Sequence, residues 1–350
     1  MFIDKAQAKY SQLLTKKDWN ILAFETSCDD TSVSVVQNGR KVLSGVISSQ
    51  IAIHNEFGGV VPEVASRKHI ENISAVLDEA MKQAGVGYGD IDAVAATYGP
   101  GLVGALLVGL NAAKSVSLSL GVPFVGVNHM EAHVCANYIS SETLEPPFLC
   151  LVVSGGHTQI VAVDSYSEYR ILGQTLDDAC GEAFDKVSRV LGLGYPGGPY
   201  IQNAALDGDP HAISFPKAKL KTGELDFSFS GLKTAVLNYI NNHKEININD
   251  VAASFQYTAV NDLSSKAMLA AKIYGYKKLA IAGGVSANKL LRETLQKQTK
   301  KAGIEFYVPK FEYCTDNASM VACAAYYKLK DGRFDDLSMN ADPALDIGQK

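Results

Sequence analysis

The chain has 350 residues, of which 47% are hydrophobic and 20% charged, so it belongs to the globular proteins and is long enough for about two domains. Collagen-like, coiled-coil and disordered classes are excluded, and a formal net charge of −5 argues against binding nucleic acid through bulk positive charge. Six cysteines, none in a C-x-x-C pair, argue against a disulfide framework or a zinc knuckle and favour a reducing cytoplasm.

The N-terminal segment carries charges throughout and shows no apolar stretch followed by a small-residue cleavage site. We therefore expect a short arm over residues 1–19 and no secretory signal. Residues 93–113 contain no charge, but Tyr98-Gly99-Pro100-Gly101 interrupts them. This break favours a buried strand, a turn and a buried helix over a membrane span.

A pattern of strand, polar turn and strand occurs twice. ILAF from Ile21 is followed by ETSCDDTS and VSVV, and FLCLVV from Phe148 is followed by SGGHTQ and IVAV. Long helical patterns come after each copy. This repetition predicts an internal duplication, with two α/β halves and a cleft between them.

Toward the C-terminus, a long helix is expected from Val251 to about Tyr274. The strand KLAIA then ends in Gly283-Gly284 and opens a helix near Ser286. Strand, double glycine and helix together bring backbone against a nucleotide in many proteins. A last strand, IEFYVP, leads to Asp316 and a closing helix.

The sharpest local signal is the pair His129 and His133. Asn128 is a good N-cap, which predicts a helix over 129–139 with both imidazoles on one face. This is metal-ligand spacing, although two histidines satisfied by internal partners are the alternative. Asp316 is the candidate third ligand, or else an acid that favours the helix dipole. Glu131 points away from the pair, which disfavours a zinc peptidase with this residue as base.

The two hairpin turns differ in charge. The first contains Asp29 and Asp30 among hydroxyl side chains, which suits cations and phosphates. The second, Ser154 to Thr158, offers bare backbone amides and hydroxyls. Together they suit the two ends of a phosphorylated ligand, although each alone is typical of ordinary turns.

Two further patterns have weaker functional interpretations. Residues 99–104 fit G-x-G-x-x-G, but no acid follows the next strand, so close helix–strand packing is expected. Asp178, Glu182 and Lys186 share a helix face as an ion-pair ladder. Gly181 is costly inside a helix and indicates close approach of backbone or ligand, and residues 196–199 are expected to close over the same place.

Taken together, these motifs closely resemble the TsaD/Kae/Gcp family over about residues 20–330, in the family's order: ETSCDDTSVSVV, HNEFGGVVPEVASRKH, GPGLVGALLVGLNAAK, NHMEAH, VSGGHTQIV, DDACGEAFDK, YPGGP, FSFSGLKTA, AGGVSAN and CTDNASM. The resemblance implies an α/β fold of the ASKHA superfamily (actin-like, sugar kinase and Hsp70-like folds), with two duplicated RNase H-like halves around an interdomain cleft. The N-terminal half would span 20–147. The C-terminal half would span 148–350, with a helical insertion at about 174–275 and a final helix that packs on the N-terminal half.

The resemblance implies transfer of the threonylcarbamoyl group of threonylcarbamoyl-AMP to the exocyclic amine of adenosine 37, in tRNAs that read codons beginning with A. By motif match, one divalent ion, Fe²⁺ in preference to Zn²⁺, would be held by His129, His133 and Asp316. Asp29 and Asp30 would be catalytic. The nucleotide-bearing substrate would be bound by Val152, Val153, Ser154, Gly155, Gly156, Asp185, Gly198 and Asn288.

The match has two departures. Gln202 stands where the family often has an acid, which puts one ribose or adenine contact in doubt, and Asp30 replaces a frequent Glu. Family members work in the cytoplasm with a TsaB-like paralogue and a TsaE-like ATPase, so these partners are expected here, with no membrane. Residues 264–310 contain ten basic residues and only two acids. The negative net charge of the whole chain therefore does not exclude tRNA binding, because this basic segment alone could contact the tRNA. A solvated lysine-rich helix face is the alternative.

Three other functions fit the sequence less well. A kinase of the same superfamily suits the expected cleft but has no evident use for the histidine pair. A metallopeptidase, the family's older label, lacks the H-E-x-x-H base. A non-catalytic scaffold copy is expected to have lost the metal ligands and glycine turns, which are intact here.

Overall fold

The computed structural model describes residues 2–217, 220 and 223–349. The chain forms two compact units. Unit 1 comprises residues 1–145, 165–169 and 315–350, and unit 2 comprises residues 146–164 and 170–314.

Unit 1 contains a five-stranded mixed sheet in the order β3-β2-β1-β4-β5. The β1–β2 and β2–β3 pairs are antiparallel, whereas β4 is parallel to both β1 and β5. The central strands are almost wholly buried because their sequences are apolar on both faces. The strands are β1 Asn20–Glu25, β2 Asp30–Gln37, β3 Lys41–Ser49, β4 Ala93–Gly99 and β5 Phe124–Asn128.

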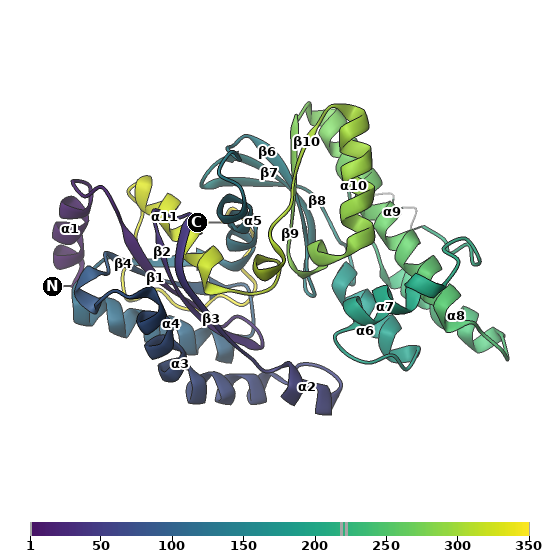
Figure 1. Cartoon of the computed structure of the whole chain (residues 1–350), viewed down its shortest axis with the longest axis horizontal. Helices are drawn as coiled ribbons and strands as arrows, with labels where there is room; N and C mark the ends of the chain where they lie inside the picture. The colour runs from purple at the N-terminus through teal and green to yellow at the C-terminus, as the bar shows by residue number, and fades with distance from the viewer. Residues whose placement is uncertain (1, 218–219, 221–222, 350) are drawn as a thin grey trace. The chain divides into compact units, whose positions relative to one another are not determined.

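Among the described residues, six α-helices belong to unit 1, and they are labelled in Figure 1. The helices α3 and α4 pack against each other and against β2 and β4, and α11 packs against α5, β1 and β2. The helices are α1 Phe2–Leu13, α2 Ile51–Phe57, α3 Pro62–Ala84, α4 Val103–Leu120, α5 His129–Ser140 and α11 Ala318–Lys330.

The uncharged stretch around residue 100 divides into β4 and α4, as expected from its glycine-proline break. Within the described part of the chain, α4 alone is long and apolar enough to cross a membrane by length and composition, which by itself is weak evidence. Its Leu106, Leu110 and Ala113 are fully buried. The helix therefore has a core-facing side of the kind found in sheet-covering helices.

Unit 2 repeats the same plan. Its sheet has the order β10-β9-β6-β7-β8, with β6 antiparallel to β7, β6 parallel to β9 and β9 parallel to β10. Read from the opposite edge, this is the strand order of unit 1, which confirms the predicted duplication. The strands are β6 Phe148–Val153, β7 Thr158–Ser165, β8 Glu168–Gln174, β9 Lys278–Ala282 and β10 Glu305–Tyr307.

The helices of unit 2 are α6 Cys180–Val190, α7 Gly197–Ala204, α8 Ser230–Asn242, α9 Ile248–Tyr274 and α10 Lys289–Ala302. One helix start differs from the prediction near Ser286. Residues Gly284–Ala287 form a 3-10 turn, and the Asn288 side chain accepts a hydrogen bond from the Leu291 backbone N–H at 3.0 Å. Because Asn288 is the N-cap, α10 begins at Lys289.

Candidate metal centre and substrate-binding loops

The histidine pair lies at the junction of β5 and α5. The Asn128 side chain accepts hydrogen bonds from the backbone N–H groups of Met130 at 2.8 Å and Glu131 at 3.2 Å. This cap begins the helix at His129, as predicted. The rings of His129 and His133 lie one turn apart, with centroids separated by 4.6 Å, and both residues are buried.

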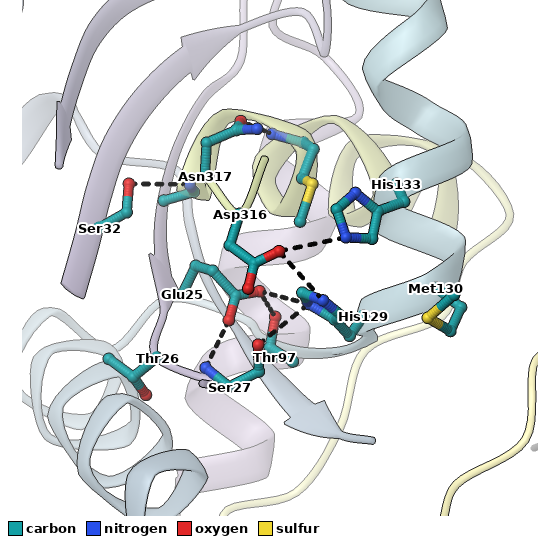
Figure 2. Close-up of polar contacts among 12 residues, drawn as sticks. Glu25, Thr26, Ser27, Ser32, Thr97, His129, Met130, His133, Asp316 and Asn317 are labelled. Carbon is teal, nitrogen blue, oxygen red and sulfur yellow. Dashed lines mark hydrogen bonds and ion pairs between the residues drawn. The ribbon is translucent and has the colours of Figure 1, made fainter. Parts of the chain in front are cut away.

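Asp316 completes a three-residue group. It precedes Asn317, whose side chain caps α11 by accepting from the Met320 N–H at 3.0 Å. Because Asn317 and not Asp316 caps the helix, the Asp316 carboxylate can face α5. Its Oδ1 lies 3.4 Å from His129 Nε2 and 3.2 Å from His133 Nε2 (Figure 2).

The three donor groups fit a metal ion. One ligand atom from each residue lies within 4.8 Å of the other two. Ligands bound tetrahedrally at 2.0 to 2.2 Å from one ion are separated by about 3.4 Å, which matches the contacts of Asp316 with both imidazoles. Two imidazoles and a carboxylate suit Fe²⁺ or Zn²⁺ and leave coordination positions open.

The charges of the group are strongly coupled. Burial opposes a charged His129, but the Asp316 and Glu25 carboxylates outweigh it and raise the His129 pKa well above its usual value. Burial and then the charge of His129 lower the pKa of His133. Burial also opposes an ionised Asp316, yet the two imidazoles lower its pKa. The pocket therefore favours positive charge held between carboxylates.

Glu25 is a member of this site that the sequence analysis did not identify. It ends β1, is 0% exposed, and its Oε2 lies 3.0 Å from His129 Nδ1. Its carboxylate also accepts from the Ser27 N–H and the Thr97 hydroxyl, both at 2.6 Å. The only signal in the sequence was an acid between an apolar strand and a polar turn.

The acidic turn of unit 1 places Asp29 and Asp30 where β2 begins. The Asp29 carbonyl accepts from the Gln50 N–H at 3.1 Å, and His69 Nε2 lies 3.0 Å from the Cys28 carbonyl oxygen. Burial raises the pKa of Asp29. Burial, with the nearby Asp316 and Asp29 charges, raises the pKa of Asp30 to about 7. Asp30 thus titrates where a general base works near neutral pH.

The neutral turn of unit 2 lies at the end of β6. Ser154 and His157 close it through a hydrogen bond from the Ser154 N–H to the His157 carbonyl at 2.8 Å. Gly155 and Gly156 are exposed, and a Cβ on either would meet no atom within 4 Å. The predicted binding residues Val152 and Val153 lie inside β6 at 0% and 1% exposure. In this structure the turn, and not the valine side chains, is open to a ligand.

Gly181 lies against the backbone of another turn. Of the two interpretations of this glycine, close approach of backbone or of a ligand, the structure shows the first. A Cβ at this position would lie 2.5 Å from the Ser154 carbonyl oxygen, and the Gly181 N–H donates to the same oxygen at 3.2 Å. On the other side, a Cβ on Gly283 would lie 2.4 Å from the Val153 carbonyl oxygen. The first turn of α6 and the double glycine after β9 therefore hold the Ser154–Gly156 turn.

The remaining predicted binding residues lie on nearby elements of unit 2. Asp185 Oδ1 accepts from the Gly197 N–H at 2.6 Å, so the Pro-Gly-Gly-Pro segment packs on α6. A Cβ on Gly198 would meet no atom within 4 Å. The Asn288 amide donates to Gln256 Oε1 at 2.8 Å.

Gln202, the departure from the family pattern, has a structural partner. Its Oε1 accepts from the Lys289 N–H at 2.8 Å, at the start of α10. A cavity of about 490 Å³ lies beside it, lined by Gln202, Ala205, Leu206, Pro210, Ala253, Gln256, Tyr257, Lys289, Leu290 and Glu293. Its walls combine apolar side chains with the amides of Gln202 and Gln256 and the charged Lys289 and Glu293.

Two patterns were given structural interpretations, and each differs in part from what was expected. Lys186 pairs with Glu182 at 2.6 Å and with Asp178 at 3.2 Å, which confirms the ion pairs. However, α6 begins at Cys180, so Asp178 precedes the helix and does not share its face. In the G-x-G-x-x-G segment, a Cβ on Gly104 would lie 2.5 Å from Ser66 Oγ of α3. This glycine serves packing, but the contact joins α4 to α3, so it is a helix–helix contact and not the helix–strand contact that was expected.

Residues 41–323 match the family model described as TsaD, tRNA N6-adenosine threonylcarbamoyltransferase. A Clostridium perfringens protein of that name is 56% identical over 334 residues, covering 94% of this chain and 98% of the relative. One from Clostridium botulinum is 55% identical over 339 residues, covering 96% and 100%.

Solved structures with a similar fold are much more distant in sequence. HypF from T. kodakarensis has a TM-score of 0.63 at 15% identity, over 90% of this chain and 48% of that one. The activator of 2-hydroxyisocaproyl-CoA dehydratase from Clostridium difficile has a TM-score of 0.52 at 13% identity, over 90% and 96%. These likenesses show the fold alone, and they agree with the predicted ASKHA architecture.

Proposed function

The chain belongs to the TsaD family of tRNA N6-adenosine threonylcarbamoyltransferases, and we propose that it catalyses the transfer for which the family is named. In this proposal the donor is threonylcarbamoyl-AMP. The acceptor is the exocyclic amine of adenosine 37, in tRNAs that read codons beginning with A, and the products are threonylcarbamoyladenosine and AMP.

The observation that carries the proposal is the group formed by His129, His133 and Asp316. Two buried imidazoles and one carboxylate would hold one divalent ion, with Fe²⁺ favoured over Zn²⁺. Such an ion supplies Lewis-acid stabilisation of charge on phosphate or carbamoyl oxygens. The helix cap at Asn128 and the burial of both imidazoles set the positions of these ligands before substrate arrives.

The chain's own groups would manage the proton of the reaction. The amine nitrogen forms a bond to the carbamoyl carbon, the bond from that carbon to the AMP phosphate oxygen breaks, and the amine loses one proton. Asp30, whose pKa is raised to about 7 chiefly by burial, suits acceptance of this proton at its carboxylate. Asp29, in the same turn, would orient the amine.

The AMP portion would be bound by unit 2. The exposed Gly155 and Gly156 leave backbone amides accessible, and backbone amides at such a turn favour phosphate oxygens. Gly198 leaves open space beside the Asp185 segment, and Asn288 starts the helix that borders the 490 Å³ cavity. This cavity would receive the adenine ring, with Gln202 on its wall.

We also propose the expected partners. The enzyme would work in the cytoplasm with a TsaB-like paralogue and a TsaE-like ATPase. The lysine-rich segment that ends at Lys310 would contact the tRNA backbone.

A reconstitution with unmodified tRNA and threonylcarbamoyl-AMP, with and without a TsaB-like partner, tests the proposal. Mass spectrometry of the digested tRNA is expected to detect threonylcarbamoyladenosine, and the His129→Ala/His133→Ala variant is expected to produce none. Absence of product in every combination would refute the proposal. ATP consumption without tRNA would support a kinase instead.

A further inference from the structure

We propose that Glu25 is a positioning residue that fixes the orientation of the His129 ring, so that Nδ1 faces Glu25 and Nε2 faces the metal site. This inference rests on the metal site of the proposed function. It adds a residue from β1 to a site whose ligands come from α5 and from the segment before α11 (Figure 2).

The hydrogen bonds around Glu25 determine the direction of its contact with His129. Its carboxylate is fully buried and lies near three hydrogen-bonding groups: the Ser27 N–H, the Thr97 hydroxyl and His129 Nδ1. A buried carboxylate is tolerated only when it is paired, and an ionised one accepts hydrogen bonds without donating them. His129 Nδ1 is therefore engaged by the Glu25 carboxylate at 3.0 Å, with the Ser27 hydroxyl 3.2 Å away. This leaves Nε2, which lies 3.4 Å from Asp316, as the metal-binding nitrogen.

The second histidine has no equivalent support. His133 Nδ1 is buried and makes no hydrogen bond to any described residue, although its Nε2 lies 3.2 Å from Asp316. The two ligands are therefore not equivalent. The Glu25 carboxylate orients His129 through Nδ1, whereas His133 is oriented by packing and by Asp316. Loss of Glu25 should act on the metal through His129 alone.

A purely structural role is the competing account, because Glu25 also joins β1 to β4 through Thr97. The two accounts differ in what they predict for metal affinity. Removing a carboxylate that supports a metal-bound histidine costs about 10- to 100-fold in metal affinity. A structural role predicts lower stability with normal affinity once the protein is folded.

The test is a metal titration of the full chain, with Co²⁺ and Zn²⁺ as probes, on wild type, Glu25→Gln and Glu25→Asp. We expect Glu25→Gln to bind each ion about 10- to 100-fold more weakly and to alter the visible Co²⁺ spectrum. Glu25→Asp should recover part of the affinity, because its carboxylate can still accept from Nδ1. Imidazole NMR of zinc-loaded wild type should show a protected Nδ1 proton on His129, which Glu25→Gln weakens.

Asp335→Asn is the matched control. Asp335 is a half-buried carboxylate of the same unit that accepts from the Gly126 N–H at 2.8 Å, and no contact joins it to His129 among the described residues. This variant should bind metal normally. If Glu25→Gln does not fold, Thr97→Val removes one donor to the same carboxylate oxygen, and it should weaken metal binding by a few-fold.

The outcomes separate this inference from the proposed function. If His129→Ala and Asp316→Ala lose the metal while the folded Glu25 variants bind it as wild type does, the role of Glu25 is refuted and the metal site stands. Equal losses in Glu25→Gln and Asp335→Asn would also refute the inference. If His129→Ala binds metal normally, the proposed metal site itself is wrong.

Discussion

Gly181→Ala tests whether the turn at Ser154 depends on the packing of α6. Gly181 is the second residue of α6, and a Cβ there would lie 2.5 Å from the Ser154 carbonyl oxygen, 2.8 Å from its carbonyl carbon and 2.9 Å from Gly155 Cα. All three are backbone atoms, so no side-chain rotation relieves the contact. The substitution must push α6 and the turn apart.

The size of the effect follows from these distances. Restoring ordinary van der Waals separation requires a movement of about 1 Å. Alanine gains about 1 kcal/mol in helix propensity, but overpacking against backbone costs about 1 to 3 kcal/mol. Loss of the bond from the Gly181 N–H to Ser154 costs about 1 kcal/mol more. We expect a net loss of about 1 to 3 kcal/mol in the free energy of unfolding, and about 100-fold in kcat/KM from the misplaced turn.

Urea denaturation and steady-state kinetics with threonylcarbamoyl-AMP measure both effects. Gly231→Ala is the control, because Gly231 is an exposed residue in the first turn of α8 where a Cβ would meet no atom within 4 Å. It should raise the free energy of unfolding by up to about 1 kcal/mol and leave kinetics unchanged. If Gly181→Ala matches Gly231→Ala in both measurements, the inferred packing is wrong.

Three other predictions concern the two units separately. Gly198→Ala should raise the free energy of unfolding by up to about 1 kcal/mol, as expected for Gly231→Ala, but weaken binding of the AMP portion, since its Cβ would occupy open space; calorimetry with AMP that shows unchanged affinity would contradict this. Asp30→Asn should raise the free energy of unfolding by about 4 kcal/mol above pH 7, because burial places the folded pKa of Asp30 at about 7, above its ordinary 3.8. Wild type therefore loses stability as pH rises between these values, and urea denaturation should show no difference between the proteins below about pH 4. Chelation with EDTA should stop transfer and Fe²⁺ or Zn²⁺ should restore it, whereas full activity of metal-free protein would exclude the role given to His129 and His133.

Local sequence rules predicted the parts of the site that lie within one element. The histidine pair needed only helical spacing and the cap at Asn128, both of which are short-range properties. The hairpins around the acidic and neutral turns needed only alternation and turn residues. These signals do not depend on which strands become neighbours, so the sequence alone is enough to predict these parts of the site.

Contacts that depend on sheet topology could not be predicted from local sequence patterns. Glu25 meets His129 because β4 lies between β1 and β5 and brings the ends of both outer strands to the same edge. No local pattern records that pairing. For the same reason the sequence could not show whether backbone or a ligand approaches Gly181, since Ser154, its neighbour, belongs to a different hairpin. The helix α10 begins later than predicted because Asn288, four residues beyond the second glycine of the pair, supplies the cap.

The duplication places two turns of opposite electrostatic character at equivalent positions of the two units. In unit 1, a Cβ on Gly101 would lie 2.6 Å from the Ser27 carbonyl oxygen, and in unit 2 a Cβ on Gly283 would lie 2.4 Å from that of Val153. In both units, therefore, a glycine after the fourth strand packs on the backbone where the first strand ends. Because the backbone arrangement is equivalent in the two units, the residues of each turn determine its chemistry. The first turn carries carboxylates at Asp29 and Asp30, which favour a cation, while the second leaves glycine amides bare, which favours an anion.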